Sequence, residues 1–289
     1  MPSDQGPIVQ SAVLRNELVR LRKEKGLTQE DVAASLEWSA SKVIRLEVGR
    51  SSITKVDLDA LLAQYGVTSE SQRDRLYTLN RGAHAPGWWN GYRNDVPAPY
   101  LTYVGYEAGA SFIRQFQGFV VPGLLQTPEY ARALTVMSVE DRDRIDSVVG
   151  LRLQRQSELA HRATPPRQYY VLDEAVIRRH IGKQDDPAIM PDQLMQIVNR
   201  AKSQERITVR LIPFEAGAHA GLSGPFTLLE FDGGLPDVLY LDAGREVIGM
   251  VTSDERVAEY ADSFESLVET ALSAEDSLEF IRSAADEMR

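Results

Sequence analysis

The chain has 289 residues, a net charge of −10, 43% hydrophobic residues and 26% charged residues. These values are close to those of a globular protein, and no apolar run approaches the roughly 18 to 20 residues that a membrane-spanning helix needs. The chain contains no cysteine, which excludes disulfide bonds, thiol nucleophiles and thiolate metal sites. The polar segment Met1–Gly6 lacks the basic and apolar regions of a secretory signal. We therefore predict a cytoplasmic protein.

The acidic charge is unevenly distributed along the chain. The first 80 residues hold 11 of the 32 Lys and Arg residues and 11 of the 42 Asp and Glu residues, so the whole acidic excess lies after residue 80. Val13–Lys55 is locally basic, with nine basic residues against six acidic ones. Phosphate binding needs a local basic face and no global excess of positive charge. The net charge is therefore compatible with a nucleic-acid-binding domain at the N-terminus.

Apolar residues at helical spacing predict five short helices in the first 80 residues. Three of the helix starts carry a residue that can cap exposed backbone amides, namely Thr28, Ser39 and Thr54. The two threonines are followed three residues later by Asp31 and Asp57, which is the spacing of a capping box.

The second and third of these helices have the spacing of a helix-turn-helix motif between Thr28 and Leu46. In that motif the second helix enters the major groove while the first crosses the DNA backbone. The small residue Ala33 suits the crossing of the two helices, and Glu37 lies in the turn. The recognition helix is predicted over Ser39–Glu47.

Two segments resemble the Xre family of phage-repressor-like helix-turn-helix domains: LVRLRKEKGLTQEDVA at residues 18–33, and Ser39–Gly49, which ends in LEVG. The resemblance implies a five-helix, lambda-repressor-like DNA-binding domain. It also implies a phosphate contact by Gln29, base contacts from the exposed face of the recognition helix, and a structural pair, Arg22 and Glu47. The predicted DNA-binding residues are Thr28, Gln29, Ser39, Ala40, Ser41, Lys42, Arg45 and Arg50.

The chain departs from this family at two positions. The family usually has glycine in the turn where this chain has Glu37, which predicts a slightly wider turn. The usual long polar base-contacting residue is Ala40 here, which predicts an apolar contact with a thymine methyl. Three assignments have simpler alternatives: Lys42 and Arg45 as solvated surface residues, and Gln29 as a cap of its own helix.

From His84 to Pro99 the chain is rich in proline and glycine turn residues and has no apolar periodicity. This pattern predicts a linker over residues 81–99, between a DNA-binding domain (1–80) and a regulatory domain (100–289). The aromatic residues in this linker indicate that it packs onto a surface. The regulatory domain is predicted to be mixed α/β (α+β). Its predicted helices are Glu107–Phe116, Pro128–Met137, Asp141–Ala163, Asp192–Lys202, Asp254–Leu272 and Glu275–Met288; its predicted strands are Tyr169–Leu172, Ile207–Pro213, Phe226–Phe231 and Val238–Leu241.

The regulatory domain carries a second resemblance. Four segments are similar to the C-terminal domain of actinobacterial antitoxin-like transcriptional regulators of the WhiJ group: VPGLLQTPEYAR (121–132), LDEAVIRRH (172–180), LIPFEAG (211–217) and GPFTLL (224–229). The resemblance implies regulation of development or specialised metabolism, often with a small partner protein encoded nearby. It identifies no sensing residues.

These observations predict a sequence-specific regulator that binds a double-stranded DNA operator in the nucleoid. Because such domains contact half-sites about 34 Å apart, we expect a homodimer, with contacts from the helices after Asp254. The C-terminal domain would receive a signal from a small-molecule effector or a partner protein. The alternative is an antitoxin-like protein that acts mainly by binding a partner and uses DNA binding for autoregulation.

An enzyme with a DNA-binding tag is the third interpretation. The four histidines are scattered, so no metal or cofactor is predicted. Asp173, Glu174 and His180 do not clearly share one face of a helix, and Ser223 lacks the spacing of a nucleophile elbow. We therefore predict that the protein is not an enzyme.

Overall fold

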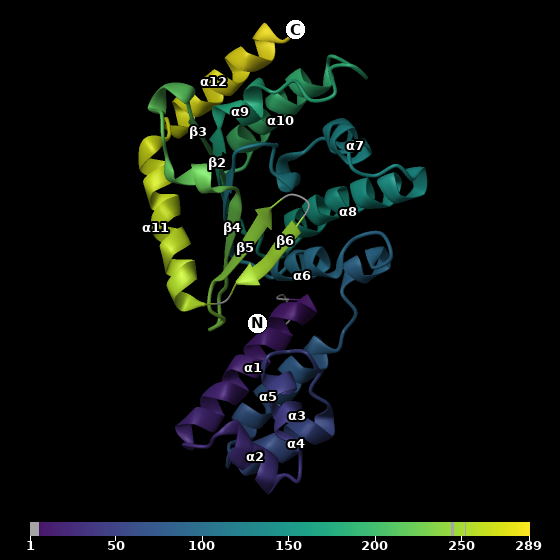
Figure 1. The fold of residues 1–289 in the computed structure, drawn as a ribbon, viewed down its shortest axis with the longest axis vertical. Coiled ribbons are helices and arrows are strands. Elements are labelled where there is room, and N and C mark those ends of the chain that lie inside the picture. The colour runs from purple at the N-terminus through teal and green to yellow at the C-terminus, as the bar shows by residue number, and fades with distance from the viewer. Residues whose placement is uncertain (1–5, 244–245, 252) are drawn as a thin grey trace. The chain divides into compact units, whose positions relative to one another are not determined.

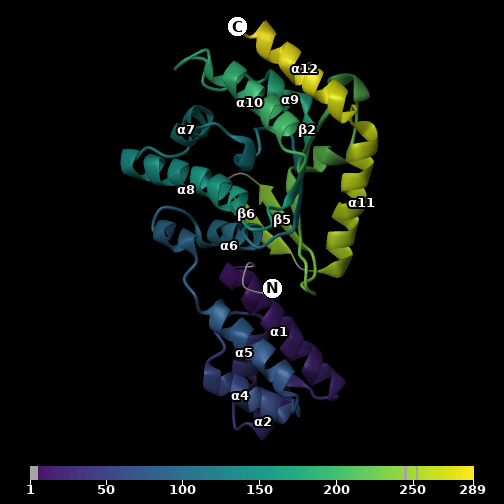
Figure 2. The same ribbon diagram turned by 180° about the vertical axis from the view of Figure 1, so that it is seen from behind.

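The computed structural model describes residues 6–243, 246–251 and 253–289 (Figures 1 and 2). Apart from Gly6, the polar segment Met1–Gly6 lies outside the described residues. The chain divides into two compact units. Residues 1–88 with 232–235 form the N-terminal unit, and residues 89–231 with 236–289 form the C-terminal unit.

The N-terminal unit is all-α, as predicted. Its helices are α1 (Gly6–Glu24), α2 (Gln29–Ser35), α3 (Ala40–Glu47), α4 (Lys55–Gln64) and α5 (Glu70–Ala83). Each helix buries one apolar stripe, and the fully buried leucines come from α1, α4 and α5: Leu14, Leu58, Leu62, Leu76 and Leu79. The stripes follow the helical spacing of the sequence, because only residues three or four apart share one side of a helix.

The predicted caps are confirmed at three helix starts. The Thr28 hydroxyl accepts a hydrogen bond from the Asp31 amide at 3.1 Å, and the Asp31 carboxylate accepts one from the Thr28 amide at 2.9 Å. Thr54 and Asp57 form the same reciprocal box at the start of α4. Ser39 caps α3 by accepting from the Lys42 amide at 3.2 Å. These bonds fix where each helix begins, because they use backbone donors that would otherwise lack partners.

The C-terminal unit is built on a mixed sheet, which confirms the predicted α+β class. The described strands form a six-stranded sheet in the order β3-β2-β1-β4-β5-β6, in which β1, β2 and β3 are parallel and the other pairs are antiparallel. The strands are β1 (Phe112–Gln117), β2 (Arg167–Asp173), β3 (Ile207–Ile212), β4 (Phe226–Glu230), β5 (Val238–Ala243) and β6 (Glu246–Val251).

Helices cover both faces of this sheet (Figures 1 and 2). One face packs on α11, whose Phe264 and Leu267 enter a cluster with Phe116, Val171 and Phe226 from the strands. The helices of this unit are α6 (Ala98–Glu107), α7 (Pro128–Val136), α8 (Arg142–Ala160), α9 (Glu174–Arg178), α10 (Ile189–Ser203), α11 (Asp254–Thr270) and α12 (Ala274–Glu287). Its short 3-10 turns include η3 (Gly123–Leu125) and η5 (Ala220–Ser223).

The predicted helix over Glu107–Phe116 is wrong. Glu107 is the last residue of α6, and Phe112–Gln117 forms β1, a central strand paired with β2 and β4. Pro97 and Pro99, which were interpreted as linker residues, lie at the start of α6, where proline costs no backbone hydrogen bond. Strand β6 and helix α6 were not predicted. The apolar residues of β1, Phe112, Ile113 and Phe116, have the spacing of one side of a helix, so the segment resembles a helix in sequence.

The aromatic residues after α5 are packed, as the sequence predicted. Trp89 is buried, with 3% of its surface exposed. The Tyr92 hydroxyl donates a hydrogen bond to Gln154 of α8 at 2.9 Å. This segment therefore belongs structurally to the C-terminal unit from Trp89 onwards.

Candidate nucleic-acid interface

Helix α3 is held from one side and exposed on the other. Val43 and Leu46 are 1% and 3% exposed and fix the helix against the rest of the unit. Arg45 is exposed, and its guanidinium donates to the Ser41 hydroxyl at 3.3 Å. Among the described residues, no carboxylate forms an ion pair with Arg45. The outward face of α3 therefore presents a cation that is free to bind an external anion or base edge.

The turn between α2 and α3 is tight and places Glu37 in the left-handed region, with φ 54°. The Trp38 amide donates to the Ala33 carbonyl at 2.8 Å, and the Glu37 amide donates to the Ala34 carbonyl at 3.4 Å. These two bonds form a Schellman motif, which normally has glycine at the left-handed position. The chain therefore closes the turn through an unfavourable backbone angle at Glu37, without inserting extra residues.

The predicted pair Arg22–Glu47 is present and joins α1 to the end of α3. The guanidinium donates to both Glu47 oxygens, at 2.6 and 3.0 Å, and to the Leu27 carbonyl at 2.7 Å. The Gln29 side-chain amide donates to Glu47 at 2.6 Å. The hydrogen bond to Glu47 is the main reason that the pKa of Arg22 is raised. One amide hydrogen of Gln29 therefore orients the side chain, and the second remains for an external acceptor.

Lys42 is engaged within the domain. Its ammonium group lies 2.6 Å from Asp57 at the start of α4 and 3.6 Å from the ring centroid of Trp38. Burial raises the pKa of Asp57, but hydrogen bonds from Lys42 and Thr54 outweigh it, so the net pKa is lowered. Lys42 therefore ties α3 to α4, and a contact with a nucleotide would require its side chain to leave Asp57.

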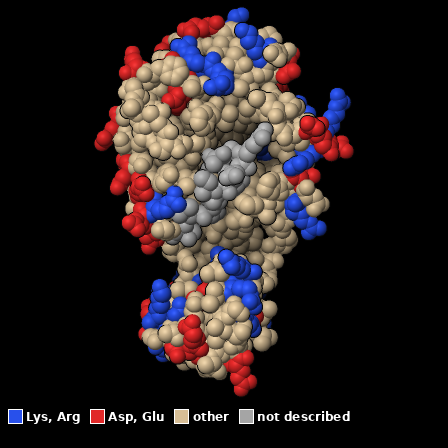
Figure 3. Space-filling model, viewed as in Figure 1, with Lys and Arg blue, Asp and Glu red and all other residues tan. Residues whose placement is uncertain are grey.

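The remaining predicted DNA-binding residues surround α3. Thr28 and Ser39 are exposed caps, Ala40 is half-buried at the first position of α3, and Arg50 is exposed just after the helix. Ile44 on α3 and Val48 just after it are also exposed, at 39% and 57%. The Lys42–Asp57 contact was not foreseen, because no local spacing connects residues 15 positions apart. Figure 3 shows Lys and Arg side chains on the N-terminal unit and acidic side chains along the α11 side of the C-terminal unit.

The titratable groups weighed as an acid–base cluster do not come together. His180 is half-buried and contacts the Pro187 carbonyl at 3.0 Å. Asp173 instead contacts His219 at 3.1 Å and caps α9 by accepting from the Ala175 amide. Within the described residues, no group of three or more His, Asp or Glu side chains is placed to hold a metal ion. No described helix combines the length and apolar character needed to cross a membrane.

Comparison with known families assigns both parts of the chain. Residues 13–76, which include α2 and α3, match the model of a helix-turn-helix domain. Residues 100–283, more than half of the chain, match a domain of unknown function (DUF5753). The chain belongs to the DUF5753 family. Its DUF5753 domain begins within α6 and ends within α12. No curated protein and no solved structure matches the chain.

Proposed function

We propose that this DUF5753 protein is a sequence-specific, double-stranded DNA-binding transcriptional regulator of the Xre type that acts in the cytoplasm, on the nucleoid. The observation that carries the proposal is the exposed Arg45 on the outward face of α3, which forms no ion pair with any described carboxylate, on a helix whose inner face is buried. Ser41 lies one turn before Arg45 on the same face. In a helix-turn-helix domain this face enters the major groove, where arginine donates two hydrogen bonds to guanine.

Within the proposed interface, Arg45 contacts the bases and Gln29 contacts the DNA backbone. Gln29 opens α2 and is oriented by Glu47, which suits a phosphate contact at the edge of the groove. Thr28, Ser39, Ala40 and Arg50 complete the proposed interface around α3. Lys42 is also proposed to contact DNA, but only when a DNA phosphate replaces Asp57 as the ion-pair partner of its ammonium group.

The test is operator binding by full-length variants after genome-wide mapping has identified the bound sites. Replacing Arg45 with alanine should weaken operator binding by about 1–3 kcal/mol and relax the preference at one base position. The Gln29→Ala variant should weaken binding to all sequences alike. Arg20→Ala is the matched control, because Arg20 lies on α1 and is balanced by Glu17 and Glu24. Operator affinity unchanged by both R45A and Q29A would refute the proposed interface.

We further propose a homodimer with contacts from the C-terminal helices. The outward positions of α11 carry the carboxylates Asp254, Glu255, Glu259, Asp262, Glu265 and Glu269. Two such faces repel each other, so a dimer through α11 should strengthen as added salt screens the charges. Gel filtration across a salt series measures this, and a monomer at every salt concentration, free and DNA-bound, would exclude the dimer.

An antitoxin-like role through a small partner protein is the second candidate. The observation that favours it is a set of three large apolar side chains exposed in the segments that follow β1 and precede β4. Phe119 follows β1, Phe214 follows β3, and Leu222 lies in η5; they are 60%, 60% and 71% exposed. The double variant F214D/L222D should lose binding to the protein encoded nearby while it keeps operator binding. Loss of neither activity would remove this candidate.

A further inference from the structure

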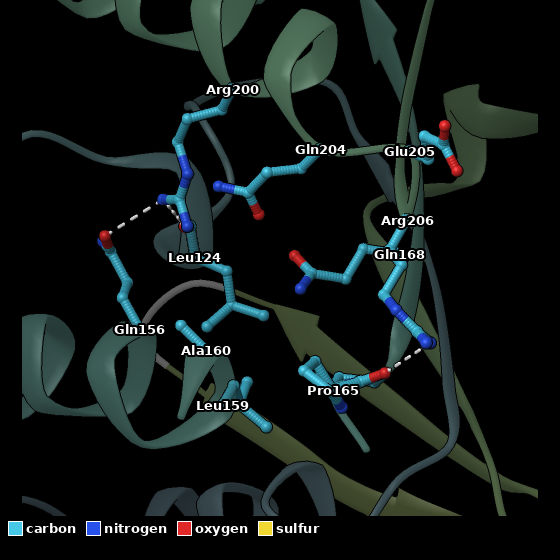
Figure 4. Close-up of a pocket in the computed structure, with 11 residues that line it drawn as sticks. Leu124, Gln156, Leu159, Ala160, Pro165, Gln168, Arg200, Gln204, Glu205 and Arg206 are labelled. Atoms are coloured by element: carbon cyan, nitrogen blue, oxygen red, sulfur yellow. Dashed lines mark hydrogen bonds between the residues drawn. The ribbon is translucent and has the colours of Figure 1, made fainter. Parts of the chain in front are cut away.

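The C-terminal unit contains a cavity that DNA recognition does not use. Its volume is about 470 Å³, which lies within the usual range of about 300–1,000 Å³ for small-molecule sites. It lies where the ends of α8 and α10 meet η3 and the start of β2 (Figure 4). The lining residues that matter here are Arg200, Gln204, Gln168, Leu124, Leu159 and Pro166.

Arg200 of α10 is fixed at the cavity by neutral acceptors. One guanidinium nitrogen, Nη1, donates to the Leu124 carbonyl at 2.6 Å and to the Gln156 side-chain oxygen at 3.1 Å (Figure 4). The Gln156 side-chain amide in turn donates to the carbonyls of Gly123 and Gln126, at 3.0 and 2.9 Å. The guanidinium therefore has a defined position, and among the described residues its Nε and Nη2 groups have no hydrogen-bond acceptor and can serve a ligand.

The positive charge of Arg200 has no counter-ion in the part of the chain that the structure describes. The guanidinium is partly buried, and this burial lowers its pKa because the cation loses hydration. A partly buried cation beside neutral acceptors is poorly compensated, and an anion that binds it recovers the lost solvation energy. A carboxylate fits best, because its two oxygens match the planar fork of arginine.

Two glutamines add neutral donors around the same space. The Gln168 oxygen accepts from the Tyr170 hydroxyl at 2.7 Å, so its amide group is left to donate. Gln168 and Gln204 both point into the hollow, whereas the Glu205 carboxylate points away from it (Figure 4). The groups that face the hollow therefore include amide donors and no carboxylate, which suits an anionic ligand.

Apolar side chains line the rest of the cavity. Leu124 and Leu159 are buried and contribute aliphatic surface, and Pro165 and Pro166 form another wall. We propose that this cavity binds a small monocarboxylate with an apolar body, with the carboxylate on Arg200 and its apolar part against the leucines and prolines. The arrangement of the fixed Arg200 guanidinium, neutral donors and an apolar wall carries this assignment. A second lining guanidinium, that of Arg206, is turned to the Pro165 carbonyl, to which it donates at 2.9 Å (Figure 4).

The test measures ligand binding to the full-length protein by titration calorimetry, without DNA. The probes are phenylacetate and octanoate, with phenylacetamide and octanamide as neutral analogues of the same shape. At least one carboxylate should bind saturably below about 10 mM, and its amide should bind at least about ten-fold more weakly, since a hydrogen bond to a charged group is lost. Arg200→Met should weaken carboxylate binding by a similar factor.

Two further variants make the result decisive. Lys202→Met removes a neighbouring exposed cation of α10 that does not line the cavity, so it should leave the affinity within about two-fold. Gln204→Glu changes an exposed residue and places a carboxylate beside Arg200, so it should block binding even if R200M fails to fold. No saturable binding by either probe, equal binding of the amides, or full binding by Q204E would overturn the site. None of these outcomes bears on operator binding, which is measured separately.

Discussion

The strained turn of the helix-turn-helix gives a prediction with a calculable sign. Glu37 has φ 54° in the Schellman motif between α2 and α3. A left-handed backbone costs an L-residue about 1–2 kcal/mol, and glycine avoids this cost. Glycine also increases the entropy of the unfolded chain, which removes about 0.4–1 kcal/mol of the gain. We therefore expect Glu37→Gly to stabilise the N-terminal unit by about 1 kcal/mol.

The assay must report on the N-terminal unit alone, because the protein has two compact units and a global unfolding curve combines the stabilities of both. Native-state hydrogen exchange of the amides in α1 to α5 meets this condition, and about 1 kcal/mol corresponds to roughly five-fold slower exchange. Glu37→Ala separates backbone strain from side-chain charge: it keeps Cβ, so exchange should change little. Ala34→Gly, at an exposed position inside α2, should speed exchange by a similar factor because glycine weakens a helix by about 1 kcal/mol.

Two outcomes would refute the reasoning. Equal protection in E37G and E37A would show that the carboxylate, not the backbone angle, is the unfavourable element. Faster exchange in E37G would show that the turn does not hold Glu37 in the left-handed region, so the Schellman geometry would be wrong.

Three other predictions concern the C-terminal unit and use urea unfolding of the full chain. Arg155→Met leaves Glu107 buried without its cation, so the free energy of unfolding should fall by about 3–5 kcal/mol. Adding Glu107→Leu should recover most of this loss, and an equal loss in the double variant would contradict the prediction. Gly221→Ala would place Cβ 2.2 Å from the ring of Phe116 and should cost about 1–3 kcal/mol; an unchanged midpoint would count against this packing. Burial raises the pKa of Asp237, so its ionised form opposes folding, and Asp237→Asn should stabilise the protein at pH 7 by less than about 1 kcal/mol. Because the carboxyl group is protonated in both the folded and the unfolded chain at low pH, this gain should vanish below about pH 4. A gain independent of pH would exclude the charge effect.

The helix-turn-helix was predictable because its signals are local. Thr28 and Asp31 are three residues apart, and a capping box needs only that spacing and two suitable side chains. Val43 and Leu46 likewise fall on one side of α3 by helical geometry alone. The same local logic assigned Arg45 to the outer face.

Strand β1 was missed because its conformation depends on distant partners. Phe112–Gln117 pairs with residues 167–172 on one side and 226–230 on the other, both more than 50 positions away in the chain. Its apolar residues Phe112, Ile113 and Phe116 are spaced as on one side of a helix, so helix and strand cannot be separated until the neighbours are known. The contacts of Arg200 with Leu124 and Gln156 have the same character: they join residues 76 and 44 positions apart.

The two cations on α3 show why a sequence position alone does not settle a role at an interface. Lys42 and Arg45 are three residues apart on one short helix, and both were predicted to bind DNA. The start of α4 places Asp57 within reach of Lys42 only, so this cation is neutralised inside the domain while Arg45 is left exposed. The face that remains consists of Arg45 flanked by the exposed apolar residues Ile44 and Val48. Such a face has one strong hydrogen-bond donor and two groups that suit thymine methyls, so we expect its specificity to combine one guanine contact with apolar contacts to neighbouring thymine methyls.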